Sequence, residues 1–78
     1  METRRLVKMA NDIGDFFAVE KDPAVGAAGV ADHIKKFWAP RMRIEILTYL
    51  DEQDGAGLSP IVLEALRTHG HELDPQAG

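Results

Sequence analysis

The sequence predicts an all-α fold, a small bundle of three to four short helices. Apolar residues recur at the i, i+3, i+4 and i+7 spacing that places them on one face of an α-helix. Three prolines, Pro23, Pro40 and Pro60, stand where such patterns begin, and the first helical turn is the place that tolerates proline best. The chain has 78 residues, of which 45% are apolar and 28% charged, the composition of one small globular domain.

The first predicted helix runs from Thr3 to Phe17. Thr3 is a residue type favoured at the N-cap, where its hydroxyl accepts a backbone hydrogen bond. Gly14 lowers the stability of this helix, because glycine loses more conformational freedom on folding than alanine does. The residues that share the apolar face are Leu6, Met9, Ala10, Ile13, Phe16 and Phe17.

The second predicted helix runs from Pro23 to Trp38, with Asp22 as its N-cap. Gly26 and Gly29 each cost about 1 kcal/mol relative to alanine. Close approach of another helix would offset this cost, so we expect a neighbouring helix at these glycines. The apolar stripe consists of Ala27, Val30, Ala31, Ile34, Phe37 and Trp38.

The third predicted helix covers residues 40–50, and its apolar residues fall on two faces. One face holds Met42 and Ile46, and the other holds Ile44 and Leu47. A helix with two apolar faces is either central to the fold or half-covered by another chain.

The fourth predicted helix follows a polar, glycine-rich loop over residues 51–57. Ser59 before Pro60 repeats the N-cap signal, and the helix ends near His69 with Gly70 as its C′ residue. We therefore expect one helical domain over residues 1–70 and a flexible C-terminal tail over residues 71–78.

Composition excludes several classes of site. The chain has no cysteine, which excludes disulfides, thiolate-rich zinc sites and cysteine-bound iron–sulfur clusters. No apolar run approaches the roughly 20 residues of a membrane span, and the N-terminus lacks a signal-peptide core, so we expect a cytoplasmic protein without a membrane partner. A chain this short also has little room for a catalytic pocket. These limits favour a protein that depends on a partner.

Neither the acidic segment nor the C-terminal histidines form a recognisable metal site. A calcium loop with Gly55 at its sixth position would place Leu50 and Ile61 where oxygen ligands are required. The histidines at positions 69 and 71 lack the H-E-x-x-H spacing and lie near a helix end. No serine or cysteine nucleophile stands beside His33. We predict no catalytic, cofactor-binding or metal-binding residue in this chain.

The segment from residue 33 to residue 43, HIKKFWAPRMR, is basic although the chain has a formal net charge of −4. Arg41 and Arg43 begin a helix, where a cation costs roughly 0.3–1 kcal/mol. Asp32 or Glu45 could pair with these arginines within the chain. Otherwise a partner supplies the anion. Arginine and tryptophan are also common at the centres of protein interfaces. The predicted partner-binding residues are His33, Phe37, Trp38, Arg41 and Arg43.

Several segments between Leu6 and Leu66 carry a resemblance to a known family. The most specific is the run H-I-x-x-F-W-x-P-R-M-R, which combines rare residues at fixed spacing. Through these segments the chain resembles the delta subunit of the soluble, cytoplasmic, NAD-dependent molybdenum or tungsten formate dehydrogenases. The matching segments are LVKMANDI at 6–13 with the phenylalanines at 16 and 17, VADHI at 30–34, FWAPRMR at 37–43, and GLSPIV at 57–62 with the alanine and leucine at 65 and 66.

The resemblance implies a complex that oxidises formate to CO₂ and passes the electrons to NAD⁺. It implies an alpha subunit with a molybdenum or tungsten bis-molybdopterin guanine dinucleotide site and iron–sulfur clusters. A beta subunit would carry FMN and the NAD site, and a gamma subunit further iron–sulfur clusters. The delta subunit is then a small accessory chain without a cofactor that binds and stabilises the alpha, beta and gamma subunits.

Two alternatives stay open at this point. One is an assembly or cofactor-insertion factor for the same enzyme. The other is a small helix-turn-helix-like nucleic-acid-binding domain, which the net acidic charge disfavours, so no nucleic-acid partner is expected. Self-association of the isolated chain is a further question that the sequence leaves open.

Overall fold

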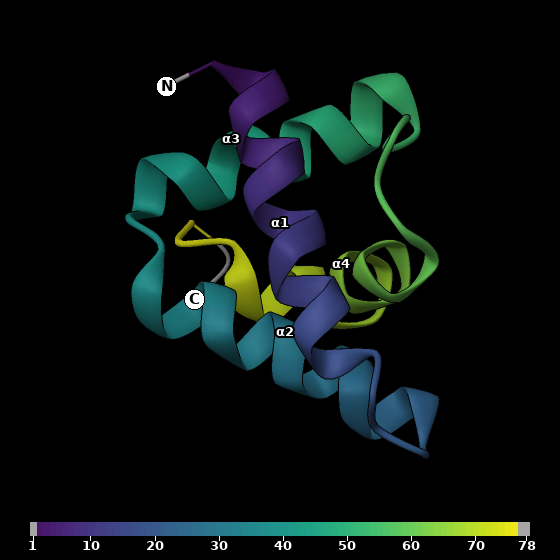
Figure 1. Cartoon of the computed structure of the whole chain (residues 1–78). Coiled ribbons are helices and arrows are strands. Elements are labelled where there is room, and N and C mark those ends of the chain that lie inside the picture. The colour runs from purple at the N-terminus through teal and green to yellow at the C-terminus, as the bar shows by residue number, and fades with distance from the viewer. Residues whose placement is uncertain (1, 77–78) are drawn as a thin grey trace.

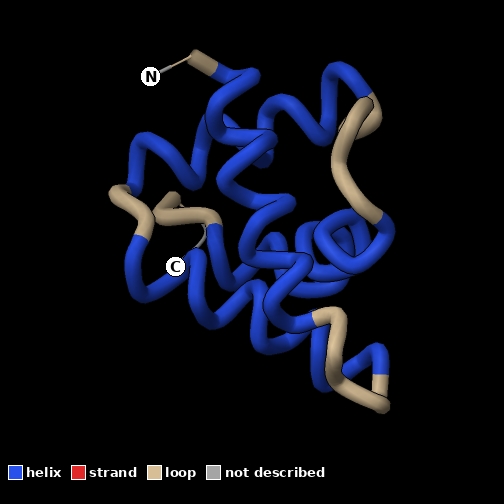
Figure 2. Tube along the Cα trace, in the orientation of Figure 1, coloured by secondary structure: helices blue, strands red, loops and turns tan. Residues whose placement is uncertain are grey.

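The structure, a computed structural model, describes residues 2–76. Within them the chain forms four α-helices and no strand: α1 (Thr3–Phe17), α2 (Pro23–Phe37), α3 (Pro40–Gln53) and α4 (Pro60–Leu73). In Figure 1, α1 crosses the front of the molecule, with α3 above, α2 below and α4 behind it. Short loops join the helices (Figure 2). The predicted all-α fold is confirmed.

Three helices begin at the residues that the sequence predicts. The Asp22 carboxylate accepts a hydrogen bond from the backbone N–H of Ala24 at 2.9 Å, so Asp22 caps α2. Pro40 and Pro60 occupy the first turns of α3 and α4. Proline fits there because the first N–H groups of a helix have no partner within it.

Two predicted side-chain caps are wrong. Glu2 is the N-cap residue of α1, and Thr3 is already helical. The Thr3 hydroxyl instead donates a hydrogen bond to Glu45 at 2.7 Å and so connects α1 to α3. Ser59 is the N-cap residue of α4, but its hydroxyl is buried without a hydrogen-bond partner among the described residues. Its backbone N–H donates to the side-chain oxygen of Asn11 at 2.9 Å, which holds the loop before α4 against α1.

The ends of α2 and α3 differ from the prediction. α2 ends at Phe37, and Trp38 is its C-cap residue with extended backbone angles. α3 continues to Gln53, so residues 51–53, predicted as part of a loop, are helical. The turn then occupies residues 54–57, where Gly55 has a φ of 68° and lies against leucine side chains. Its left-handed conformation suits glycine and ends the helix.

α4 also extends beyond its predicted end. It continues to Leu73, four residues past His69, and Gly70 lies inside the helix rather than at the C′ position. Residues 71–73 of the predicted tail are therefore helical, whereas residues 77 and 78 lie outside the described part of the chain. Leu73 is buried, so the last turn of α4 is packed against the core.

The core lies between α2 and α4, with α1 and α3 packed across them. The predicted close approach at the glycines of α2 is confirmed. A Cβ atom on Gly26 would lie 3.0 Å from the Phe17 carbonyl oxygen, and one on Gly29 would lie 2.5 Å from the Phe17 ring. The buried apolar residues are Leu6, Ala10, Ala27, Val30, Ala31, Ile34, Trp38, Ile46, Leu58, Val62, Ala65, Leu66 and Leu73.

α3 buries Ile46 completely, and residues from both of its predicted apolar faces pack partly against the core, Met42 on one and Leu47 on the other. Ile44 stays 36% exposed. α3 therefore contributes to the core from one side of the bundle rather than through its centre. No helix within residues 2–76 is both long enough and apolar enough to cross a membrane.

Candidate functional site

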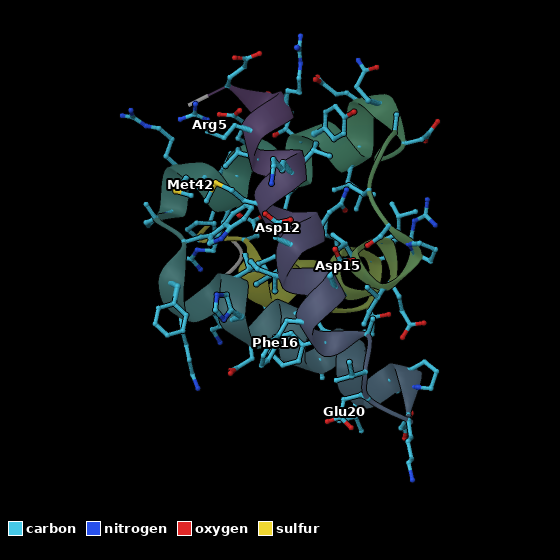
Figure 3. The ribbon with its side chains drawn as sticks, viewed as in Figure 1. Arg5, Asp12, Asp15, Phe16, Glu20 and Met42 are labelled. Carbon is cyan, nitrogen blue, oxygen red and sulfur yellow. The ribbon has the colours of Figure 1, made fainter. Side chains whose placement is uncertain are left out.

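A shallow apolar groove runs between α1 and α2 and ends at the first turn of α3. Two adjoining hollows of about 380 and 430 Å³ form it, and both are lined by Asp12, Ile13 and His33. We call it the α1–α2 groove. Figure 3 shows Met42, Asp12 and Phe16 along the face of the molecule that α1 presents. The groove is lined by Met9, Asp12, Ile13, Phe16, Phe17, His33, Phe37, Trp38 and Met42.

An aromatic stack forms one wall of the groove. The His33 ring lies 4.7 Å from the Phe37 ring, its neighbour one helical turn further along α2. It also lies 6.5 Å from the Phe17 ring of α1, in an edge-on arrangement. Phe37 is 72% exposed although it belongs to the predicted apolar stripe. Two of the predicted partner-binding residues, His33 and Phe37, thus lie together at the surface.

Trp38 lies in the same wall, closer to the core than the other aromatic rings. It is only 6% exposed, and its backbone N–H donates to the Ile34 carbonyl at 2.9 Å as α2 ends. The extended backbone at this C-cap turns the chain toward Pro40 and the start of α3. Trp38 therefore supports the groove from within the core and offers a partner little of its own surface.

The two predicted arginines occupy different environments. Arg41 is exposed and pairs with no acidic residue in the described part of the chain. The Arg43 side chain is half-buried and donates from Nη1 to the Leu73 carbonyl at 3.3 Å, at the C-terminal end of α4. Cations are favoured at a helix C-terminus, so Arg43 has a role within the chain. Of these two arginines, Arg41 is the one left exposed to meet an anionic partner.

The two acids considered for pairing with these arginines are bonded elsewhere. Asp32 forms an ion pair with Lys36 at 3.0 Å, one turn along α2. Glu45 accepts the hydrogen bond from Thr3. Arg41 therefore keeps the unfavourable position in the first turn of α3 without compensation from either acid.

Phe16 belongs to the groove, although its spacing predicts a place on the core face of the first helix. It is 73% exposed, and its ring meets the Phe17 ring edge-on at 5.0 Å. Phe16 stands about 100° around the helix from Phe17 and so lies at the edge of the apolar face. The apolar spacing alone does not mark this edge.

The groove carries few polar side chains. Its only charged lining residue, Asp12, is exposed and bonded to Lys8 at 3.0 Å. Its walls are otherwise apolar or aromatic, with His33 as the single imidazole. Within residues 2–76, no group of three His, Cys, Asp or Glu side chains could hold a metal ion. His69 and Glu72 of α4 approach only each other, at 3.6 Å.

Comparison with known proteins identifies one family. The family model for the NADH-dependent formate dehydrogenase delta subunit FdsD matches residues 5–66. This region includes the α1–α2 groove and the run from His33 to Arg43. No curated protein and no solved structure matches the chain. Because the match extends over most of the 78 residues, the chain belongs to the family of formate dehydrogenase delta subunits.

Proposed function

We propose that this chain is a non-catalytic accessory subunit of a cytoplasmic NAD-dependent formate dehydrogenase, which converts formate and NAD⁺ to CO₂ and NADH. It binds and stabilises the larger alpha, beta and gamma subunits. Family membership over residues 5–66 supports the association with this enzyme. The observation that carries the binding role is the α1–α2 groove, where Phe16 and Phe37 leave most of their rings uncovered. Exposed apolar surfaces of this kind are typical of interaction sites.

The chemistry of the complex resides in the other subunits. We assign no step of formate oxidation to this chain. The partners supply the molybdenum or tungsten bis-molybdopterin guanine dinucleotide centre, the iron–sulfur clusters and FMN. The role left to this chain is to cover and hold a surface of those subunits.

The contact involves the predicted partner-binding residues to different extents. His33, Phe37 and Arg41 reach the surface and make the contact directly. Trp38 and Arg43 act indirectly. Trp38 supports the groove wall from the core, and Arg43 holds the end of α4. Substitution of Arg43 would disturb the fold, so it does not test the contact.

The first experiment asks whether the chain is a permanent subunit. The complete enzyme is purified through a tag on its largest subunit, and the ratio of delta to alpha chains is measured by native mass spectrometry. A constant ratio in active enzyme, with faster thermal inactivation when the chain is deleted, supports the proposal. Active enzyme that lacks the chain and keeps its thermal stability contradicts it. A cofactor-poor enzyme after deletion, together with absence of the chain from mature complex, would instead identify an assembly factor.

The second experiment tests the contact residues. Phe37→Ser and Arg41→Glu are each expected to lower the amount of chain retained in the purified complex. Val25→Ser and Lys21→Glu are matched controls, because both residues are exposed and lie outside the groove. Equal loss in the controls, or full retention of both groove variants, would show that the contact lies elsewhere.

A further inference from the structure

We propose that the α1–α2 groove binds one amphipathic helix of a larger formate dehydrogenase subunit, with the acidic end of that helix beside Arg5 and Arg41. This inference rests on the proposed function and specifies the form and the charge of the partner segment. It follows from three properties of the groove: the kind of elements that form its walls, its length, and the charges at one of its ends.

The walls favour a helix over an extended peptide. α1 and α2 satisfy their backbone groups internally, and the described residues include no strand whose edge could pair with an incoming chain. Extended peptides gain much of their affinity from such main-chain pairing. An amphipathic helix has no need of it, since it binds by inserting apolar side chains into a groove between helices. The exposed rings of Phe16 and Phe37 lie where such side chains would pack.

The length of the groove fits about two turns of helix. Its lining on α1 extends from Met9 to Phe17, which spans about 12 Å at roughly 1.5 Å per residue. A bound helix with apolar residues at i, i+3 or i+4, and i+7 covers nearly the same distance. Two adjoining hollows that share His33 provide places for successive apolar side chains.

One end of the groove is basic. Arg5 lies one helical turn before Met9, and Arg41 directly precedes Met42, so both cations flank this end. Figure 3 shows Arg5 near Met42.

Neither arginine pairs with an acidic side chain in the described part of the chain. A partner helix with acidic residues at the matching end complements this arrangement, and the complementarity fixes its direction in the groove.

Photo-crosslinking in the complete enzyme complex tests the inference. The photoreactive residue p-benzoylphenylalanine replaces Phe16 in one variant, Phe37 in a second and Val25 in a control. We expect the first two variants to crosslink to one segment of a single larger subunit, at positions three, four or seven residues apart. The Val25 variant should not reach that segment. Crosslinks to a second delta chain, to two unrelated segments, or to no protein in an intact complex would overturn the inference.

Charge reversal tests the predicted direction. Arg41→Glu and Arg5→Glu should each weaken retention of the chain in the complex, and reversal of the facing charge on the crosslinked segment should restore it to within about threefold. Lys21→Glu serves as the control. Failure of every rescue overturns the charge arrangement. A complex that never contains the chain refutes the proposed function itself, whereas an intact complex with crosslinks only from outside the groove refutes this inference alone.

Discussion

Leu73 provides a direct test of the extended fourth helix. It lies in the last turn of α4, its side chain is 1% exposed, and its carbonyl accepts the hydrogen bond from Arg43. A flexible tail beginning at residue 71 would make this leucine irrelevant to stability. The packed helix end predicts instead that Leu73→Ala destabilises the isolated chain, and that truncation after Gly70 does so more strongly.

The size of the effect follows from the burial. Removing the side chain of a core leucine costs about 2–5 kcal/mol, which includes the cavity that remains. Leu73 stands at a helix terminus where the chain can relax, so we expect the lower part of this range, about 2–3 kcal/mol. A domain of 78 residues has a total stability on the order of 4–12 kcal/mol at about 0.05–0.15 kcal/mol per residue. The expected fall in Tm is about 10–20 °C.

Thermal unfolding of the isolated chain, followed by far-ultraviolet circular dichroism, measures this change. Val19→Ala is the matched control, because Val19 is 84% exposed and its truncation should change stability by less than about 0.5 kcal/mol. A Tm for Leu73→Ala within about 3 °C of the native chain, or equal to that of the control, would refute the packed helix end.

Three further predictions test other contacts of the fold. Asp22→Ala removes the cap of α2 and should cost about 0.5–2 kcal/mol in urea unfolding, whereas Asp22→Ser should retain most of the stability. Asn11→Ala removes two hydrogen bonds to the loop before α4 and should cost about 1–3 kcal/mol, with faster amide exchange at Ser59; unchanged exchange there would contradict this role. Gly55→Ala should destabilise the chain more than Gly57→Ala. The added Cβ would lie 2.5 Å from the Leu63 side chain at position 55, but 3.7 Å from its nearest neighbour, Val7, at position 57. The reverse order of stability would argue against this packing.

The helix beginnings were predictable from the sequence, and the helix ends were not. Asp22 and the prolines at 23, 40 and 60 act through local backbone geometry that any short segment of sequence contains. The ends depend on distant contacts. α3 ends where Asp54 and Gly55 are both left-handed and Leu50, Leu58 and Leu63 surround Gly55. Gly70 stays helical because Leu73 beyond it is held in the core. A glycine alone does not distinguish these two outcomes.

The candidate site was predictable in part for a similar reason. Composition and spacing drew attention to His33, Phe37 and Arg41, and all three reach the surface. The same pattern could not show that Trp38 is covered by the core or that Arg43 turns to the end of α4, since both depend on how the helices pack. The exposure of Phe16 was not predictable, because an amphipathic pattern does not show which residue at the edge of an apolar stripe reaches the surface.

The position of Trp38 has a practical consequence. It is the only tryptophan in the chain, it is shielded from water, and it contributes to one wall of the α1–α2 groove. Because the core covers Trp38, its fluorescence reports whether this wall is packed rather than whether the groove is filled. Emission should stay at short wavelength in the folded chain and move to longer wavelength when the wall opens on unfolding, without any attached dye. The protein thus carries an intrinsic optical probe of the wall that supports the surface where we expect its partner.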